Sequence, residues 1–437
     1  MTWIIVVVAF LLALLGTPLF AVLALGALVA FWTQDIGSAS VSAEMVRLAT
    51  SPVLIAIPLF TFAGYLFSES KTPQRLVRLT RAAFGWVPGG LALVAMVACA
   101  LFTAFTGASG VTIVAMGGLL MPALLKDGFS PRFSLGLLTT SGSLGLLFPP
   151  SLPLILYSYV ASTSAGGMLT SSAAAPSVDR LFLAGILPGI FLIGALAVLS
   201  VRQGVIQLGG RVPFRWGELW SAFREGAWEV PLPFIILGGI YGGKLTVTEA
   251  ASVTALYALI VEVFIYRDIP LNKLSGIVRE SMTLVGGILV ILAAALGLTN
   301  FLVDAEVPLR ILDGIRGLVT SRLAFLMLLN AFLLVVGCLM DIFSALIVVV
   351  PLIIPIAQEY DVNLIHLGII FLANLEIGYM TPPVGLNLFI SSYRFQRPVV
   401  EVYRSTFPFL ITLLIALLVI TYWPDLSLFL PRLFGGG

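Results

Sequence analysis

Ionisable side chains are scarce in this chain of 437 residues: charged residues make up 10% of it, whereas hydrophobic residues make up 59%. The chain has one histidine, His366, and two cysteines, Cys99 and Cys338, which lie in separate apolar runs without Cys-x-x-Cys spacing. This spacing excludes a redox pair and a cysteine zinc site, so we expect two small buried thiols. Several uncharged runs are long enough to provide the ~20 residues that cross hydrocarbon. The sequence therefore predicts a membrane protein with many spans.

The common enzyme signatures are absent as well. No His-Glu-x-x-His zinc motif occurs, and a single histidine leaves little choice for a Ser/His hydrolytic pair. Residues 238–245 resemble a phosphate-binding loop, but Leu245 stands where Ser or Thr would hold magnesium. The net charge of +2 is spread over loops, which argues against a nucleic-acid surface. We expect neither an enzyme nor transport driven by ATP through this chain alone.

Two apolar segments carry the same interruption. The pattern Gly-x-x-x-Pro-Pro occupies residues 145–150 and 378–383, an offset of 233 positions, which is the difference between 378 and 145. Two successive prolines end a helix and leave backbone carbonyls without donors. Lipid supplies no donors, so such backbone must be buried in protein or line a watery cavity. Paired interruptions in two halves of a chain are typical of the binding site of a transporter.

The loops predict the orientation of the chain, because Lys and Arg are enriched in cytoplasmic loops. We place the N-terminus in the cytoplasm and the C-terminus in the periplasm. The basic or basic-leaning segments placed in the cytoplasm are residues 71–81, 126–132, 202–224, 267–279 and 394–404, and the segments placed outside are 161–178 and 358–363. The spans that satisfy this bias are residues 3–31, 51–67, 133–160, 181–201, 231–243, 247–266, 281–303, 364–391 and 407–423.

Two further apolar stretches, residues 89–125 and 323–357, must each enter and leave on one side of the membrane. Each suits two limbs of ~17 residues that meet within the bilayer. Polar or small-residue tips lie near their centres, at residues 106–110 and 337–341. The predicted fold is an all-α polytopic membrane protein, an inverted repeat with two re-entrant helical hairpins and two Pro-broken transmembrane helices. Its units are residues 1–229 and 247–437, and an extra span and loop at residues 230–246 invert the second unit.

Each unit also has a polar arm, at residues 68–87 and 304–322. In the first arm Lys71, Arg75 and Arg78 alternate with apolar residues, which suits an amphipathic helix lying along the membrane interface. Two interpretations stay open, a bracing element and a plain connecting helix.

The tips and breaks supply hard oxygen ligands, which suit sodium better than a transition metal. The first predicted metal site joins the first tip to the first break and comprises Thr106, Gly107, Ser109, Ser141, Gly142, Ser143 and Gly145. The second comprises Gly337, Met340, Asp341, Glu376, Gly378, Thr381 and Pro382. A substrate cradle is predicted at Ser109, Pro149, Pro150, Asp341, Thr381, Pro383 and Asn387. The alternative is that these small residues only permit close helix packing.

Single ionisable residues inside apolar segments need separate interpretations. Asp341 is the only charged residue of the second hairpin and is a functional candidate, either as a cation ligand or as a structural hydrogen-bond acceptor. Glu249 either has a function or caps the helix that it opens. We expect Glu262 on a solvated face, and we expect His366 near the interface rather than in a proton relay.

These motifs resemble the large membrane subunit of tripartite ATP-independent periplasmic (TRAP) transporters, the DctM type. The resemblance covers nearly the whole chain, and its most specific run is residues 374–389, Asn-Leu-Glu-Ile-Gly-Tyr-Met-Thr-Pro-Pro-Val-Gly-Leu-Asn-Leu-Phe. Shorter matching runs are Ile57-Pro58-Leu59-Phe60 with Ala63-Gly64, Gly89-Gly90-Leu91-Ala92, the tip from Phe105 to Gly110, Leu146-Leu147-Phe148-Pro149-Pro150-Ser151 and Thr248-Glu249-Ala250-Ala251. The chain departs from the family pattern at the first tip, where Ala108 leaves Ser109 as the only hydroxyl residue between Gly107 and Gly110.

The resemblance implies uptake of an organic acid, a carboxylate or a sialic-acid-like compound, coupled to Na⁺ across the bacterial inner membrane. It implies two partners: a small four-helix membrane subunit (DctQ type) and a periplasmic substrate-binding protein (DctP type), which would dock on loops such as 161–178 and 302–307. It also implies an elevator mechanism, in which a hairpin-bearing domain moves against a static scaffold. Two alternatives stay open: a stand-alone sodium- or proton-coupled carboxylate carrier, and a channel or an intramembrane enzyme.

Overall fold

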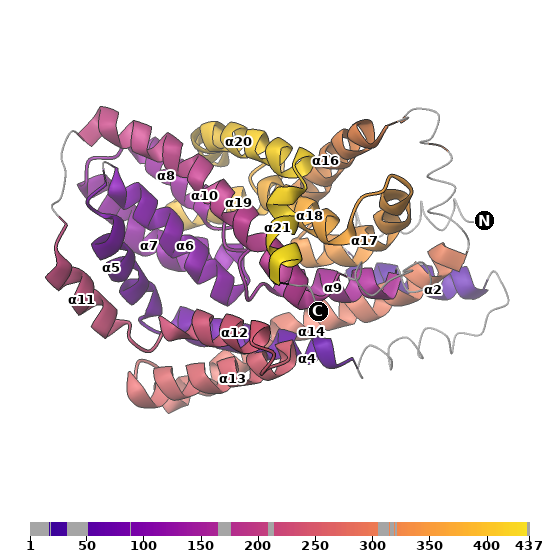
Figure 1. The fold of residues 1–437 in the computed structure, drawn as a ribbon, viewed down its shortest axis with the longest axis horizontal. Helices are drawn as coiled ribbons and strands as arrows, with labels where there is room; N and C mark the ends of the chain where they lie inside the picture. Colours follow the sequence, from indigo (N-terminus) through magenta and orange to yellow (C-terminus); the bar gives the residue numbers. More distant parts are fainter. Residues whose placement is uncertain are drawn as a thin grey trace.

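The computed structural model of the chain describes residues 17, 19–32, 51–87, 89–164, 176–208, 214–304, 314, 319 and 321–434. These residues form eighteen α-helices and one π-helix, and they contain no strand (Figure 1). Seven of the helices are long and apolar enough to cross a membrane, or eight if one bent pair counts as a single span. The prediction of an all-α polytopic protein is confirmed.

The helices of the first half follow the predicted order. They are α2 (Leu19–Trp32), α4 (Pro52–Glu69), α5 (Thr72–Phe84), α6 (Gly90–Thr106), α7 (Ser109–Lys126), α8 (Pro131–Ser141), α9 (Leu152–Ser164) and α10 (Val178–Leu208). Two short helices, α11 (Trp216–Glu225) and α12 (Pro231–Tyr241), lead into the second half. Most of the predicted span 3–31 and the whole loop 165–175 lie outside the described residues.

The second half repeats this order. Its elements are α13 (Val247–Leu259), the π-helix η2 (Ile260–Ile265), α14 (Leu271–Asp304), α16 (Arg322–Leu339), α17 (Ile342–Glu359), α18 (Leu364–Gly378), α19 (Leu386–Phe395), α20 (Val399–Tyr422) and α21 (Asp425–Phe434). The second predicted arm, residues 304–322, lies almost entirely outside the described residues.

Both helical hairpins and both broken helices are present. Helices α6 and α7 form the first hairpin, and α16 and α17 form the second. Residues 142–151 separate α8 from α9, residues 379–385 separate α18 from α19, and each break contains a cis peptide bond between its two prolines. The hairpins differ in that α6 and α7 pack on each other, whereas α16 packs along α18 and α17 packs on α9 and α14. The limbs of the second hairpin therefore lie further apart, because each takes its packing from another helix.

Packing between the two halves is reciprocal. Helix α4 packs on α13 while α2 packs on α14, and α8 packs on α20 while α10 packs on α18. The second limb of each hairpin likewise packs on the distal piece of the other half's broken helix, α7 on α19 and α17 on α9 (Figure 1). Two similar units related by a two-fold axis would give this exchange of partners. The residue boundaries of the units stay a prediction.

Several helices differ from the predicted spans. Helix α12 has 11 residues, which at ~1.5 Å per residue cover about half of a ~30 Å hydrocarbon core. The extra span predicted at residues 231–243 is therefore too short to cross by this helix alone. Helices α11 and α21 were not predicted, because their charged residues made them resemble loops. Helix α14 begins ten residues before the predicted span at 281, and α20 begins at Val399 instead of 407.

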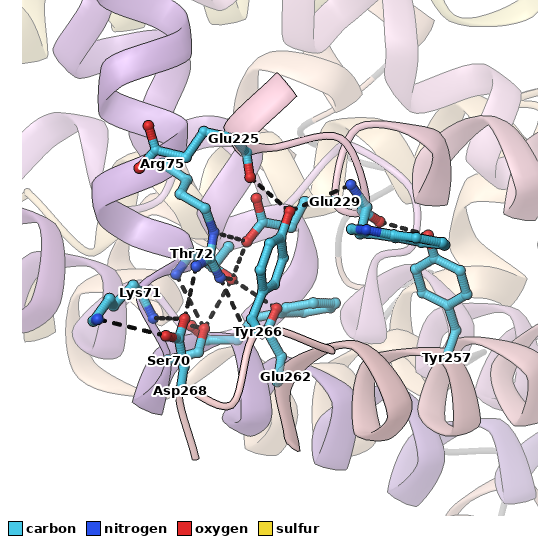
Figure 2. A network of polar contacts seen from close by, with 12 residues as sticks. Ser70, Lys71, Thr72, Arg75, Glu225, Glu229, Tyr257, Glu262, Tyr266 and Asp268 are labelled. Carbon is cyan, nitrogen blue, oxygen red and sulfur yellow. Dashed lines mark hydrogen bonds and ion pairs between the residues drawn. The ribbon is translucent and has the colours of Figure 1, made fainter. Parts of the chain in front are cut away.

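The first arm is a brace. Helix α5 leaves α4 at an angle of 77° and buries one face, which includes Arg75. The Arg75 guanidinium contacts three carboxylates, with 2.5 Å from Nε to Glu229 Oε1, 3.1 Å from Nη2 to Glu262 Oε2 and 2.7 Å from Nη1 to Asp268 Oδ2 (Figure 2). It also lies 3.9 Å from the ring centroid of Tyr266. This buried cluster joins α5 to the turn before α12 and to the end of η2.

The cluster corrects the interpretation of Glu262. Its side chain is fully buried against Arg75 rather than solvated, because the π-helical turn that carries it faces an arm helix 187 residues earlier in the chain. Burial raises the pKa of Glu229 even though the Arg75 guanidinium acts in the opposite direction. With Lys71 paired to Asp268, the cluster holds three carboxylates against two cations.

The structure places two further residues that the sequence singled out. His366 is fully buried in protein, with Nδ1 3.2 Å from the Ser427 hydroxyl and Nε2 3.2 Å from the Thr421 carbonyl, and its place near the membrane interface stays a prediction. Helix α21, which was not predicted, covers the start of α18. Glu249 caps α13 in a capping box with Thr246, as the capping interpretation predicts.

Candidate functional site

The first hairpin tip is seated against the first break. Helix α6 ends at Gly107, whose φ of 66° lies in the left-handed region that favours glycine. A Cβ at Gly145 would lie 2.6 Å from the backbone nitrogen of Ala104, so the break lies directly on α6. A Cβ at Gly142 would lie 3.2 Å from the carbonyl oxygen of Ser109, the first residue of α7. The break therefore contacts both limbs of the hairpin.

Hydroxyl groups complete this first site. The Thr103 hydroxyl donates to the Gly142 carbonyl at 2.9 Å and lies 2.7 Å from the Thr112 hydroxyl. The Ser141 hydroxyl donates to the Leu137 carbonyl of its own helix. The Thr106 hydroxyl is buried and has no hydrogen-bond partner in the described chain. The structure thus seats Gly142 and Gly145 on the first hairpin. All seven residues predicted for the first site are buried: Thr106, Gly107, Ser109, Ser141, Gly142, Ser143 and Gly145.

The second tip is joined to the second break more closely. A Cβ at Gly378 would lie 2.6 Å from the Gly337 backbone, and the Gly385 amide donates to the Cys338 carbonyl at 3.0 Å. The Tyr379 hydroxyl accepts a 2.6 Å hydrogen bond from the Ile342 amide. Tyr379 was not predicted as a site residue, although its place directly after Gly378 in the break was a signal for it. These backbone contacts fix the position of the second hairpin tip relative to the second break.

Asp341 caps α17. Its Oδ1 accepts hydrogen bonds of 3.0 Å from the Phe343 and Ser344 amides, and its Oδ2 accepts one from the Ser344 hydroxyl. The structure therefore contains the hydrogen-bond acceptor that was one of the two interpretations, and the cation ligand stays a prediction. Beside it, Met340 is half-buried, and the Thr381 hydroxyl donates to the Ile377 carbonyl at 3.0 Å.

Glu376 is a carboxylate without a counter-charge. The side chain is fully buried two residues before the end of α18, and neither carboxylate oxygen has a hydrogen-bond partner among the described residues. Burying an isolated carboxylate is costly, so such a group binds either a proton or a cation. The amide oxygens of Asn374 and Asn387 are buried without donors as well. Hard oxygens that lack donors are what a sodium ion needs, so Glu376 and Asn387 are each candidate ligands. Asn374 lies two residues from Glu376 on α18 and therefore faces another side of the helix.

The predicted substrate cradle is divided between the halves. Ser109, Pro149 and Pro150 are buried, whereas Asp341 and Pro383 are exposed and Thr381 is half-buried. No hydrogen bond joins Ser109 to Asp341 or Thr381 in the described chain. Asn387 connects the halves, since its amide nitrogen lies 3.5 Å from the Thr139 carbonyl of α8. The first break is therefore mostly buried, whereas residues 382–384 of the second break are exposed at the surface of the chain.

A buried polar chain extends behind the second site and was not predicted. Asn374 Nδ2 donates to Asn330 Oδ1 at 2.7 Å, and the Asn330 amide lies 3.1 Å from the Thr421 hydroxyl. These contacts join the second hairpin and the second broken helix to α20. The only sequence signal was the presence of two asparagines inside apolar segments.

Two hairpins seated on two proline-interrupted helices are the arrangement expected of a membrane transporter. Residues 5–426 match the family "Tripartite ATP-independent periplasmic transporter, DctM component". The chain is a member of this family, which consists of TRAP transporter large permease subunits.

Relatives that are named for different substrates are similar to this chain over most of its length. It is 35% identical over 390 residues to the C4-dicarboxylate TRAP transporter large permease protein DctM of Rhodobacter capsulatus, covering 87% of each chain. It is 29% identical over 437 residues to the ectoine TRAP transporter large permease protein TeaC of Halomonas elongata, covering 99% of each. The sialic acid TRAP transporter permease protein SiaT of Haemophilus influenzae is 28% identical over 391 residues, 89% of this chain and 61% of that protein.

A solved structure shares the fold. The YdaH transporter of Alcanivorax borkumensis superposes with a TM-score of 0.64 at 12% identity, over 90% of this chain and 88% of that one. At this identity the similarity supports the arrangement of the helices and gives no information about the substrate.

Proposed function

We propose that this chain is the transport subunit for sodium-coupled uptake of a small organic acid by an elevator mechanism. The observation that supports it most is that buried oxygens without donors lie at the first hairpin tip, on Thr106, and in the helices that flank the second break, on Glu376 and Asn387. The relatives are named for transport of C4-dicarboxylates, ectoine and sialic acid, which are all small polar compounds. The match to this chain covers most of the length of the C4-dicarboxylate and ectoine permeases.

Sodium would be held by oxygens at the two sites. Thr106 and the carbonyls of the first tip and break are the donors of the first site, and Glu376, with Asp341 and Thr381, is the centre of the second. A bound cation supplies the positive charge that an uncompensated Glu376 lacks and would fix the tip against the break. We assign the carboxylate of the substrate to Asn387 and to the exposed part of the second break.

The family description implies partners, since it names one component of a tripartite transporter. We propose a small membrane subunit of the DctQ type and a periplasmic binding protein of the DctP type, in a bacterial inner membrane. The N-terminus would be cytoplasmic and the C-terminus periplasmic, as the positive-inside bias predicts.

Uptake into liposomes tests this function. Vesicles that contain the chain with its small subunit are given a radiolabelled C4-dicarboxylate, ectoine or sialic acid, with an inward sodium gradient and a candidate binding protein. We expect saturable accumulation of one substrate that requires both additions. Uptake that needs neither would identify a stand-alone carrier, and flux without accumulation above the outside concentration would identify a channel.

Three variants test the sodium sites. We expect Glu376→Gln, Asp341→Asn and Ser109→Ala to raise the half-saturating sodium concentration about tenfold each, which corresponds to a loss of about 1.4 kcal/mol of binding free energy per ligand. Asn is itself a good N-cap, so Asp341→Asn keeps α17 capped while it removes the charge. The matched control is Glu249→Gln, an exposed capping carboxylate.

A second measurement keeps binding separate from activity. Sodium that binds the folded state raises the melting temperature of the wild-type protein relative to potassium. We expect Glu376→Gln to lose this shift without a fall in its melting temperature in potassium. An unchanged sodium shift in all three variants would remove these residues from the sites.

A further inference from the structure

The surface between α5 and α11 combines aromatic rings with arginines. Helix α11 packs along α5 and turns its aromatic side chains outward, with Trp216 75% and Trp220 57% exposed. Phe214 bridges the two elements, since its ring lies 6.4 Å from Trp86 and 5.0 Å from Trp216, edge-on to both. Tryptophan is enriched where membrane proteins meet the headgroup region of a bilayer, so this face has the composition of an interface.

A hollow of about 570 Å³ lies beside these rings. Its walls include Arg78, Arg81, Trp86, Phe214, Arg215 and Glu218. Arg78 is committed to other groups, because it pairs with Glu218 and Glu225 and donates to the Ser221 hydroxyl at 3.0 Å. Arg81 and Arg215 form no ion pair within the described chain. The one carboxylate of the wall is thus already bound, and two guanidinium groups share the hollow without counter-charges.

We infer that this hollow binds the anionic headgroup of a membrane phospholipid. Guanidinium groups bind phosphate oxygens through two parallel hydrogen bonds, and they are the preferred side chains for this task. Trp86 and Phe214 at the rim give the upper part of the acyl chains an apolar surface. A soluble anion would use the arginines but leave the exposed rings without a role, and the uncompensated charge favours an anionic lipid over an apolar protein surface.

Energy transfer from tryptophan to a dansyl-labelled lipid measures this binding on the full-length chain in neutral detergent. The probes are dansyl-phosphatidylglycerol, which is anionic, and dansyl-phosphatidylethanolamine, which is zwitterionic. Each arginine near a membrane surface adds roughly one kcal/mol of attraction to anionic lipid, so two of them predict about 30-fold tighter binding of phosphatidylglycerol. We expect the double variant Arg81→Gln/Arg215→Gln to lose this preference.

The control is Arg224→Gln, an exposed arginine on the same helix that lies over Trp220 and outside the hollow. We expect it to keep most of the preference, and an equal loss would overturn the site in favour of a diffuse basic surface. Because Arg81 and Arg215 are exposed, both variants should keep the wild-type melting temperature. Displacement of the lipid by millimolar glycerol phosphate would identify a site for free anions, and loss of lipid binding on adding the small membrane subunit would identify a protein interface.

Discussion

Gly378 and Gly337 bring two backbones together at the second break, and no side chain fits between them. A Cβ at Gly378 would lie 2.6 Å from Gly337 backbone atoms, which cannot turn aside as a flexible side chain could. We expect Gly378→Ala to abolish uptake and to lower the melting temperature by several degrees, because the tip must separate from the break. The control is Gly286→Ala, a helical glycine with open space around its Cβ position, which should be neutral or slightly stabilising.

Single charged residues were the least predictable part of the sequence. The wrong interpretation of Glu262 and the unpredicted burial of His366 share one cause: each side chain faces an element distant in sequence, α5 for Glu262 and α21 for His366. Glu376 was predicted from its place beside the break, yet its isolation depends on the side chains that surround it. The residue type shows whether a side chain can carry charge or donate a hydrogen bond. The residues that surround it in the fold decide whether it is paired, capped or left without a counter-charge.

At the scale of the element, the arm helix α5 has two arginines in opposite environments. Arg75 is buried among three carboxylates, and Arg78 is about 40% exposed with its two glutamates. Removing one partner from a buried ion pair leaves uncompensated charge and costs about 3–5 kcal/mol. We expect Arg75→Met to destabilise the protein by this order and to loosen α5 from η2.

Arg78→Met is the matched control for this effect, since solvent screens its ion pairs. We expect Arg78→Met to lose only a small fraction of the unfolding free energy that Arg75→Met loses. The measurement is thermal unfolding of both variants in the same detergent, together with proteolysis of the segment between α4 and α6. Equal melting temperatures for the two variants would contradict the role of the buried cluster as a brace.

Elements encoded by local pattern were predicted well, and elements that depend on distant packing were not. The hairpins and broken helices follow from apolar runs, glycine-rich tips and double prolines, all of which act within a few residues. Helices α11 and α21 are each ten residues long and contain charged, polar and apolar residues, so only the surfaces they cover distinguish them from loops. The greater separation of α16 and α17 could not be predicted, because α9 and α14 take up the packing surface of α17.

At the scale of the whole molecule, an elevator requires that the hairpins move relative to their surroundings. Two native contacts join a hairpin to a long helix outside it: Met96 Sδ to the Ser200 hydroxyl at 4.0 Å, and the Asn330 amide to the Thr421 hydroxyl at 3.1 Å. In a chain with Cys99 and Cys338 replaced by alanine, we expect cysteines at either pair to cross-link with mercury. The cross-link should stop uptake, and thiol reagent should restore it.

A cross-link inside one hairpin is the control for this experiment. The hydroxyls of Thr103 and Thr112 lie 2.7 Å apart on α6 and α7, which would move together. Cysteines at this pair should cross-link equally well and leave uptake at the level of the uncross-linked variant. Full transport by the cross-linked Met96/Ser200 and Asn330/Thr421 variants would rule out motion of either hairpin against α10 or α20.

The sequence by itself determined the class of the protein, its paired hairpins and breaks, and its family, because hydrophobic length and proline act locally and the motifs are contiguous. Only the tertiary structure decided that Arg75 binds three carboxylates, that Glu376 has no counter-charge, and that the first break is buried while the second is exposed. These outcomes depend on which segments meet across separations such as the 187 positions between Arg75 and Glu262. The solvation and the charge balance of a side chain depend on these contacts between distant segments, and no local sequence pattern encodes them.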